Sequence, residues 1–417
     1  MTTELRVLEP SEWEPWFGAL ELAFGGNDPW PGDERAFFHG RTEFGRSLGV
    51  WDGEDCVGTA GAYSFRLSVP GGALVPAAGV TMVSVAATHR RRGILTSMMR
   101  RQLDDVRSWG EPLAVLTASE PAIYGRFGYG TATQGLSAEI DTSRVRLTAP
   151  ATGDAADGSH EVRLRRVRPD DPAVRDACEA VYAAEVAGRP GMLARQPGWE
   201  GLPVVGGKPK DGASALQCVL AERHGEVVGF TLYRLKPQWD DAGPRGTVEL
   251  DDLYARDPAA CGALWEYLFG IDLTSTVRTG NRPPDDPFQY LVSDVRRCAL
   301  RVRDELYLRP VEVGAALEAR TYRTPVDVVL AVEDAFCPWN EGTWRLSGDS
   351  KGASCERTGD RPELALSVRE LGAAYLGGTS LTALAGAGRV RELRKGALAE
   401  ASSAFGSDVA PWLPHGF

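Results

Sequence analysis

This 417-residue chain has few cysteines and histidines, which are scattered along it, and it has no long apolar run. The seven cysteines are odd in number and never form a Cys-x-x-Cys pair, and the five histidines show no His-x-His or His-x-x-x-His spacing. This pattern argues against a disulfide framework and against a zinc site, so we expect no metal. No segment approaches the ~18 consecutive apolar residues of a membrane helix, so we expect no membrane span.

Positive charge is in the minority, with 46 Lys and Arg against 57 Asp and Glu, and the net charge is −11. An acidic protein repels the phosphate backbone of nucleic acids, so we expect no nucleic-acid partner. The first residues, MTTELRVLEP, lack the basic start and the apolar stretch of a secretory signal. We therefore expect a cytoplasmic protein.

The length exceeds what one hydrophobic core usually organises, and an internal repeat divides the chain. Residues 49–65 and 219–235 each contain an apolar strand, a charged turn with glycine, and a second strand that opens with Val-Gly, the pattern of a hairpin. Each hairpin is followed by a strand, a loop and a helix, in VTMVSVAATHRRRGILTSMMRRQL and in GTVELDDLYARDPAACGALWEYLF. The sequence therefore predicts two copies of one mixed α/β unit.

A small, polar segment without periodicity, residues 149–160, separates the two copies and predicts a linker. The last part of the chain changes character. It predicts a strand leading into a helix near residue 315, a strand-turn-strand over 324–346, and a helix over 390–404. We predict three domains, 1–150, 161–302 and 303–417, of which the third is α+β.

The two copies differ in the loop before the helix. In the first copy, residues 90–93 (RRRG) lie between a β-rich strand over 80–86 and a helix that begins near Arg92. The second copy has DPAA at residues 257–260, with no basic side chain. The first helix has one apolar face, formed by Leu95, Met99, Leu103 and Val106.

Such a loop is suited to binding phosphate. A helix N-terminus offers unpaired N–H groups and a positive dipole end, and glycine lets a phosphate approach the backbone. Arginines add charge-assisted contacts. On RRRG alone, a solvated basic turn remains the alternative, whereas the strand before it and the helix after it favour the phosphate site. Only the first copy then binds an anion.

A short apolar strand at residues 113–115 is followed by LTASEPAIYGRFGYG, a constrained turn rich in glycine and aromatic residues. We expect Tyr124 to follow a strand that lies beside the strand over 80–86. A tyrosine there could act as a general acid, and an aromatic side chain that fills the core is the alternative.

The loop resembles motif A of the GCN5-related N-acetyltransferases (GNAT), although Leu95 replaces the small residue at its end. Together, VSVAATHRRRGIL and ASEPAIYGRFGYG closely resemble the Eis (enhanced intracellular survival) acetyltransferase family. The likeness continues through VDVVLAVEDAFCPWNEGTWRL and ELGAAYLGGTSLTALAGAGRV. The resemblance implies an α/β (α+β) fold class, with two tandem GNAT-like mixed-sheet domains and a C-terminal α+β domain similar to sterol carrier protein.

The resemblance also implies site residues. Tyr124 matches the family's general acid, and the C-terminal α-carboxylate, here that of Phe417, matches its general base. The backbone of the strand near Val83 matches the groups that orient the acetyl carbonyl. The positions that match the family's acetyl-CoA contacts are Val83, Ser84, Val85, Arg91, Arg92, Gly93, Ile94, Leu95, Thr96, Ser119 and Glu120.

The implied function is N-acetyl transfer by direct attack, with acetyl-CoA as co-substrate and aminoglycoside-type polyamines as acceptors, acetylated at several positions. A homohexamer is also implied. The alternatives are a protein lysine N-acetyltransferase and a non-catalytic lipid-binding or scaffold protein that retains a GNAT fold. Aromatic and acidic side chains suit cationic amines, but we assign no firm role to the N-terminal candidates Trp13, Trp16, Phe24, Asp28, Trp30, Asp33, Glu34, Phe37 and Phe38.

Overall fold

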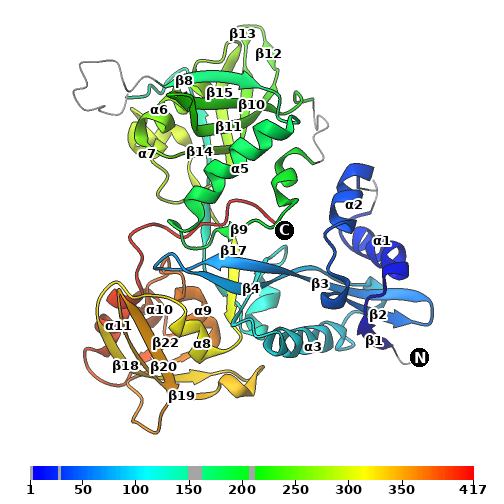
Figure 1. Cartoon of the computed structure of the whole chain (residues 1–417), viewed down its shortest axis with the longest axis vertical. Coiled ribbons are helices and arrows are strands. Elements are labelled where there is room, and N and C mark those ends of the chain that lie inside the picture. Colours follow the sequence, from blue (N-terminus) through cyan, green and yellow to red (C-terminus); the bar gives the residue numbers. More distant parts are fainter. Residues whose placement is uncertain (1–2, 27–29, 149–161, 206–211) are drawn as a thin grey trace. The chain divides into compact units, whose positions relative to one another are not determined.

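The computed structural model of the chain describes residues 3–26, 30–148, 162–205 and 212–417 (Figure 1). Its contacts form two compact units. Unit 1 contains Met1–Thr133, Arg189–Ala194 and Glu305–Phe417, and unit 2 contains Gln134–Gly188 and Arg195–Asp304. The linker expected at residues 149–160 lies outside the described residues, and the three consecutive domains 1–150, 161–302 and 303–417 stay a prediction.

The larger sheet of unit 1 is mixed. Its strands lie in the order β1 (Glu4–Val7), β2 (Leu48–Asp52), β3 (Asp55–Ser68), β4 (Leu74–Val85), β5 (Leu113–Thr117), β17 (Leu306–Pro310) and β6 (Gly130–Thr131), and β9 (Leu193–Ala194) pairs with β3. The hairpin expected over residues 49–65 is confirmed as β2 and β3, which are paired antiparallel.

Two helices pack on this sheet through separate hydrophobic clusters. Helix α3 (Ile94–Ser108) buries Met98, Met99 and Leu103 against β-strand residues such as Val50. Helix α1 (Trp13–Ala23) buries Trp16 and Phe17 in another cluster, which includes Trp51. Because neighbouring strand residues such as Val50 and Trp51 join different clusters, the two helices cover opposite faces of the sheet. Helix α2 (Gly32–His39) follows α1.

Strand β17 comes from the start of the predicted third segment, yet it pairs antiparallel with β5 from Leu306↔Thr117 to Pro310↔Leu113. Strand β7 (Gln134–Asp141), from the first predicted segment, belongs to unit 2 and pairs there with β15 (Thr274–Arg282). The partners of both strands lie far away in the sequence. Local periodicity predicts that such strands exist but does not predict the sheet in which they pair.

The C-terminal part of unit 1 holds a second sheet, in the order β20 (Gly352–Arg357), β19 (Gly342–Asp349), β18 (Val326–Glu333), β21 (Leu364–Ser367) and β22 (Val390–Glu392). Its helices are α8 (Val313–Glu318), α9 (Val368–Ala374), α10 (Leu381–Gly386) and α11 (Ala397–Phe405). The helix expected over residues 390–404 is wrong in its first part, because Val390 pairs with Leu366 in β22 and Gly396, at φ +94°, starts the helix only at Ala397.

Unit 2 repeats the first copy. Its sheet has the order β16 (Arg301–Asp304), β7, β15, β14 (Gly246–Ala255), β11 (Glu226–Lys236), β10 (Gln217–Arg223) and β8 (Arg163–Val167). The expected hairpin is confirmed as β10 and β11, and the expected strand and helix as β14 and α6 (Pro258–Phe269). Helix α5 (Pro172–Val186) takes the place that α1 has in unit 1, and β12 (Trp239–Asp240) and β13 (Gly243–Pro244) form a small ribbon.

Candidate active site

Strand β4 bends at Met82, and this bend opens the candidate site. Met82 has φ +53°, and the register with β3 is irregular at this point. The hydroxyl of Thr59 donates to the Met82 carbonyl at 2.7 Å, which holds the bend in place. On its other side, β4 pairs with β5 only as far as Gly79, opposite Val115. From Val80 onward, β4 lines a cavity of about 750 Å³ instead of continuing that ladder.

The basic loop closes one end of this cavity. Arg91 and Gly93 both have positive φ, at +61° and +82°, so the helix begins at Ile94 and not near Arg92 as expected. No side chain caps the N-terminus of α3, so the first-turn N–H groups stay available to an anion. Of the predicted loop residues, Arg92 does not line the cavity, and those that do are Arg91, Gly93, Ile94, Leu95 and Thr96.

Tyr124 lies across the cavity at the end of the short helix α4 (Pro121–Tyr124), and Ser119 and Glu120 line the wall beside it. The Tyr124 ring packs edge-on against the buried Tyr129, with 6.1 Å between the ring centroids. Burial, and then the charge of Glu120, raise the pKa of Tyr124 to about 12. The phenol therefore holds its proton at neutral pH.

The turn that carries Tyr124 is supported by a buried arginine. Arg309 on β17 donates to the Phe127 carbonyl at 2.5 Å and forms a fully buried ion pair with Asp334 at 2.6 Å. A Cβ at Gly128 would lie 1.6 Å from the Arg309 Nη1 atom, and Gly128 has φ +84°. This turn therefore needs glycine for its backbone conformation as well as for the space that Arg309 occupies.

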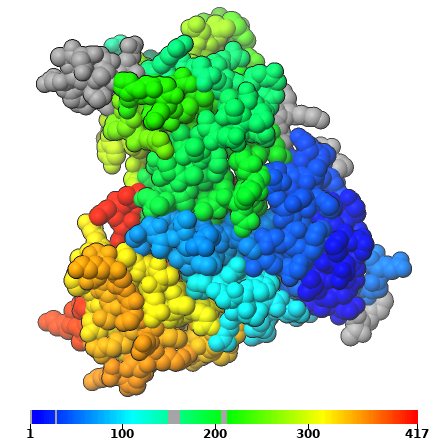
Figure 2. Space-filling model, in the orientation of Figure 1, coloured from blue at the N-terminus to red at the C-terminus, as the bar shows by residue number. Residues whose placement is uncertain are grey.

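The last residue of the chain reaches this cavity. The Thr81 hydroxyl on β4 donates to the Phe417 main-chain oxygen at 2.9 Å. The Phe417 ring packs edge-on against Phe65, with 5.0 Å between the centroids. Figure 2 shows part of the red C-terminal segment at the surface beside the blue residues of the first sheet. The cavity is thus lined both by Tyr124 and by the terminal residue.

One wall of the cavity is apolar. It is formed by Leu20, Ala23, Phe24, Trp30 and Phe38. Of the other candidates for the amine pocket, Trp13, Trp16 and Phe37 are buried in the core, Asp33 and Glu34 on α2 do not line the cavity, and Asp28 lies outside the described residues.

Sequence reasoning missed some cavity residues, namely Arg126 and, on α1, Leu20 and Ala23. Arg90 of the predicted RRRG loop also lines the cavity, although it is not among the positions matched to the acetyl-CoA contacts. Arg126 lies two residues after Tyr124 in the glycine-rich turn, and this proximity is the signal that could have identified it. The apolar residues of α1 carry no such signal, because a core helix has the same pattern.

In the described residues of the second copy, side chains occupy the positions that border the cavity in the first copy. Asp257 caps α6 by accepting from the Ala260 N–H at 3.0 Å, and it also pairs with Arg223. The buried Arg282 donates to the Leu253 carbonyl on β14 at 2.9 Å and forms an ion pair with Asp286 at 2.7 Å. Strand β14 has its own irregularity, because its register with β11 shifts between Leu250 and Asp252. Side chains therefore already occupy both the helix N-terminus and the backbone beside this bend.

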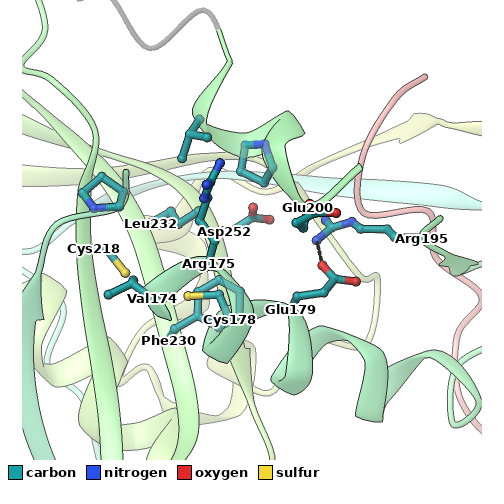
Figure 3. Close-up of a pocket in the computed structure, with 13 residues that line it drawn as sticks. Val174, Arg175, Cys178, Glu179, Arg195, Glu200, Cys218, Phe230, Leu232 and Asp252 are labelled. Carbon is teal, nitrogen blue, oxygen red and sulfur yellow. Dashed lines mark hydrogen bonds and ion pairs between the residues drawn. The ribbon is translucent and has the colours of Figure 1, made fainter. Parts of the chain in front are cut away.

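A small pocket remains in unit 2 between α5 and the sheet (Figure 3). Its volume of about 20 Å³ has room for roughly one water molecule. Arg195 pairs with Glu179 at 2.9 Å at one end, and burial raises the pKa of Asp252 to about 6. The side chains of α5, β10, β11 and β14 that converge on it include Val174, Arg175, Cys178, Cys218, Phe230 and Leu232.

No helix in the described part of the chain has the length and apolar content that a membrane span requires. Within the same residues, no group of three or more His, Cys, Asp and Glu side chains is arranged to hold a metal ion.

Comparison with known proteins gives the same architecture. Models described as acetyltransferase (GNAT) domain match residues 4–132 and 191–310, and a model described as sterol carrier protein domain matches residues 313–414. These matches support the predicted fold class, two GNAT domains followed by a sterol-carrier-like domain with mixed α/β sheets.

Relatives with full-length similarity carry acetyltransferase names. An uncharacterized N-acetyltransferase of Streptomyces avermitilis is 65% identical, with 100% of each chain covered. N-acetyltransferase Eis of Mycobacterium tuberculosis is 34% identical over 87% of this chain and 86% of its own length. The crystal structure of Eis1 from Mycobacterium abscessus superposes with a TM-score of 0.83 at 34% identity, with 100% of each chain covered. This chain is therefore an N-acetyltransferase that belongs to the Eis family.

Proposed function

We propose that this enzyme transfers the acetyl group of acetyl-CoA directly to a primary amine of a small molecule, with Tyr124 as general acid and the Phe417 carboxylate as general base. The observation that carries the proposal is one cavity of about 750 Å³ that is lined by an uncapped helix N-terminus, by a phenol and by the end of the chain. These are the groups that a phosphate-bearing thioester, a departing thiolate and an attacking amine each require.

The cofactor end of the site fits acetyl-CoA, which supplies the activated thioester. The uncapped first turn of α3, with Gly93, Ile94, Leu95 and Thr96, would hold its pyrophosphate, and Arg91 and Arg92 would add charge. The backbone of Val83, Ser84 and Val85 would hold the pantetheine arm and orient the thioester carbonyl. Ser119 and Glu120 complete this set from the wall beside β5.

The two catalytic groups divide the proton transfers. Tyr124 is protonated at neutral pH, as an ordinary tyrosine is, and burial raises its pKa further, to about 12, so it can protonate the thiolate as the thiolate leaves. The Phe417 carboxylate, beside Thr81, accepts the proton that the amine loses on attack. Strand amides of β4 stabilise the negative charge that develops on the carbonyl oxygen.

The acceptor belongs to the amine class, and we further propose aminoglycoside-type polyamines acetylated at several positions. A wide cavity supports several binding modes, and the aromatic wall of Phe24, Trp30 and Phe38 supports cation–π contacts with ammonium groups. The homohexamer and the cytoplasmic location stay predictions. The rivals are a protein lysine acetyltransferase and a lipid-binding or scaffold protein.

One assay separates these possibilities. The protein is incubated with acetyl-CoA and a panel of aminoglycosides, simple primary amines and a lysine-rich protein, and the release of free coenzyme A is followed with a thiol reagent. We expect release with the small amines. Release with the lysine-rich protein alone would favour the first rival. No release with any amine, together with lipid that co-purifies with the protein, would contradict the proposal.

A further inference from the structure

The seat of the C-terminal residue is made by three residues of two neighbouring strands. Thr81 of β4 donates its hydroxyl proton to the main-chain oxygen of Phe417, 336 positions away in the sequence. Phe65 of β3 packs edge-on against the Phe417 ring. A Cβ at Gly79 would approach the Phe417 ring to 3.1 Å and the Phe65 ring more closely still, so a glycine at this position makes room for both rings.

The tail that leads to this seat is fixed along its length. Trp412 and Leu413 are buried, at 3% and 1% exposure. The Trp412 N–H donates to the Pro190 carbonyl at 2.9 Å, and the Arg189 guanidinium donates to the Ala410 carbonyl at 2.7 Å. The short segment Arg189–Ala194, which joins β3 through β9, therefore guides the tail within unit 1. Because these contacts already hold the preceding residues, one further hydrogen bond is enough to orient the terminal carboxylate.

We propose that Thr81 is a positioning residue that holds the C-terminal carboxylate of Phe417 beside the bend of β4, where the acetyl-accepting amine is deprotonated. This inference rests on the proposed function, because it assigns Thr81 a role through the carboxylate that acts as base. The hydroxyl is the right group for this task. It donates one hydrogen bond to an anion and carries no charge of its own, so it orients the carboxylate without neutralising it by an ion pair.

Removing the hydrogen bond between Thr81 and Phe417 should lower the rate because the carboxylate would be displaced. A base that is displaced by about 1 Å loses up to 10²-fold in rate, because proton transfer needs heavy atoms within hydrogen-bond distance. Thr81→Val keeps the shape of the side chain and removes the donor. We expect this variant to lower kcat roughly 10-fold to 10²-fold with little change in the KM for acetyl-CoA, and we expect Thr81→Ser to restore most of the loss.

A double-mutant comparison shows whether Thr81 acts through the terminus. Adding one alanine after Phe417 moves the carboxylate, and Thr81→Val is measured in the native chain and in the extended chain. If Thr81 positions the carboxylate, the substitution has no further effect in the extended chain. Equal losses in both chains would overturn the inference, because Thr81 would then act on something other than the terminus. Thr274→Val is the matched control, since its hydroxyl also donates to a backbone carbonyl, at 2.7 Å, but in unit 2.

A second measurement needs no turnover and therefore separates this inference from the proposed function. Carboxypeptidase A removes a C-terminal aromatic residue only when the tail leaves its seat, and intact-mass spectrometry follows the loss of Phe417. We expect faster release from Thr81→Val than from the native chain, Thr81→Ser or Thr274→Val. Unchanged release from Thr81→Val would overturn the positioning role, even if the native enzyme acetylates amines. Faster release from a protein that acetylates nothing would support the seat and contradict the proposed function.

Discussion

The two copies of the strand-loop-helix unit share a backbone plan and differ at the start of the helix. In the first copy, Gly93 leaves the N-terminus of α3 without a cap, and the loop carries three arginines. In the second copy, Asp257 accepts from the first turn of α6 and brings a negative charge to the place where a phosphate would bind. The same helix end is thus open to an anion in one copy and closed to it in the other.

The copies differ again beside the bent strand. In unit 1 the backbone after Gly79 borders a cavity, whereas in unit 2 the Arg282 side chain reaches β14 and donates to the Leu253 carbonyl. Under the proposed function, the shared scaffold does not decide whether the cofactor binds, and a few side chains at the helix end and beside the strand decide it.

The largest expected effect concerns the phenol of Tyr124, which lines the cavity of the first copy. Tyr124→Phe removes the general acid but keeps the ring that packs on Tyr129, so kcat should fall about 10²-fold to 10⁴-fold while the Kd for acetyl-CoA changes little. Coenzyme A release and equilibrium binding measure the two quantities. Tyr290→Phe, at an 83% exposed tyrosine, is the control. Native kcat in Tyr124→Phe would refute the role of Tyr124.

The next largest effect concerns Arg282, whose side chain occupies the space beside β14 in the second copy. Arg282→Met leaves the buried Asp286 without its ion-pair partner, and losing one partner of a buried pair costs about 3–5 kcal/mol. Urea denaturation should show this loss in the free energy of unfolding, and the Kd for acetyl-CoA should stay the same. The double substitution Arg282→Met with Asp286→Leu should recover much of the stability. A change in cofactor affinity in Arg282→Met would contradict the division of roles between the copies.

A third prediction concerns a variant in which the first loop receives an acidic N-cap residue like that of the second loop. Gly93→Asp places a carboxylate at the N-cap position of α3, the position that Asp257 holds at α6, so its negative charge competes with a bound phosphate. A charge-assisted hydrogen bond is worth about 1.5–3 kcal/mol, so the Kd for acetyl-CoA should rise about 10-fold to 10²-fold. Because Gly93 has φ +82°, Gly93→Asn is the matched control for backbone strain. An equal rise in Kd in both variants would show that strain, and not charge, is responsible.

The smallest effect is a shift in pH dependence. Burial and the charge of Glu120 raise the pKa of Tyr124 to about 12, so its protonated, active form persists to higher pH than that of an ordinary tyrosine, whose pKa is about 10. The kcat/KM should therefore show no loss from Tyr124 ionisation up to about pH 10. Glu120→Gln should move any alkaline loss to lower pH. An alkaline limb centred near pH 9 in the native enzyme would contradict the assignment of Tyr124.

The sequence predicted the parts of this comparison that are local. The two hairpins, the strand and helix after each, and the contrast between RRRG and DPAA all depend on residues close together in the chain, and local propensity and charge report them. The start of α3 was misplaced, because the positive φ values of Arg91 and Gly93 are backbone properties of the folded loop.

The parts that the sequence could not predict depend on distant contacts. Three such contacts join segments whose local sequence patterns are ordinary. They are the pairing of β17 with β5, the hydrogen bond from Arg309 that supports the Tyr124 turn, and the hydrogen bond from Arg282 to β14. The role expected for Phe417 came from family resemblance, because nothing in PWLPHGF indicates a catalytic carboxylate. The contact with Thr81 becomes visible only when β4 and the tail are placed together.

The number of acetyl-CoA molecules bound per chain tests the central claim most directly. Calorimetric titration of the native enzyme with acetyl-CoA should give one site per chain, and the same site in Gly93→Asp should bind acetyl-CoA about 10-fold to 10²-fold more weakly. Two sites per chain, or one site that survives unchanged in Gly93→Asp, would contradict the account in which the first copy alone binds the cofactor.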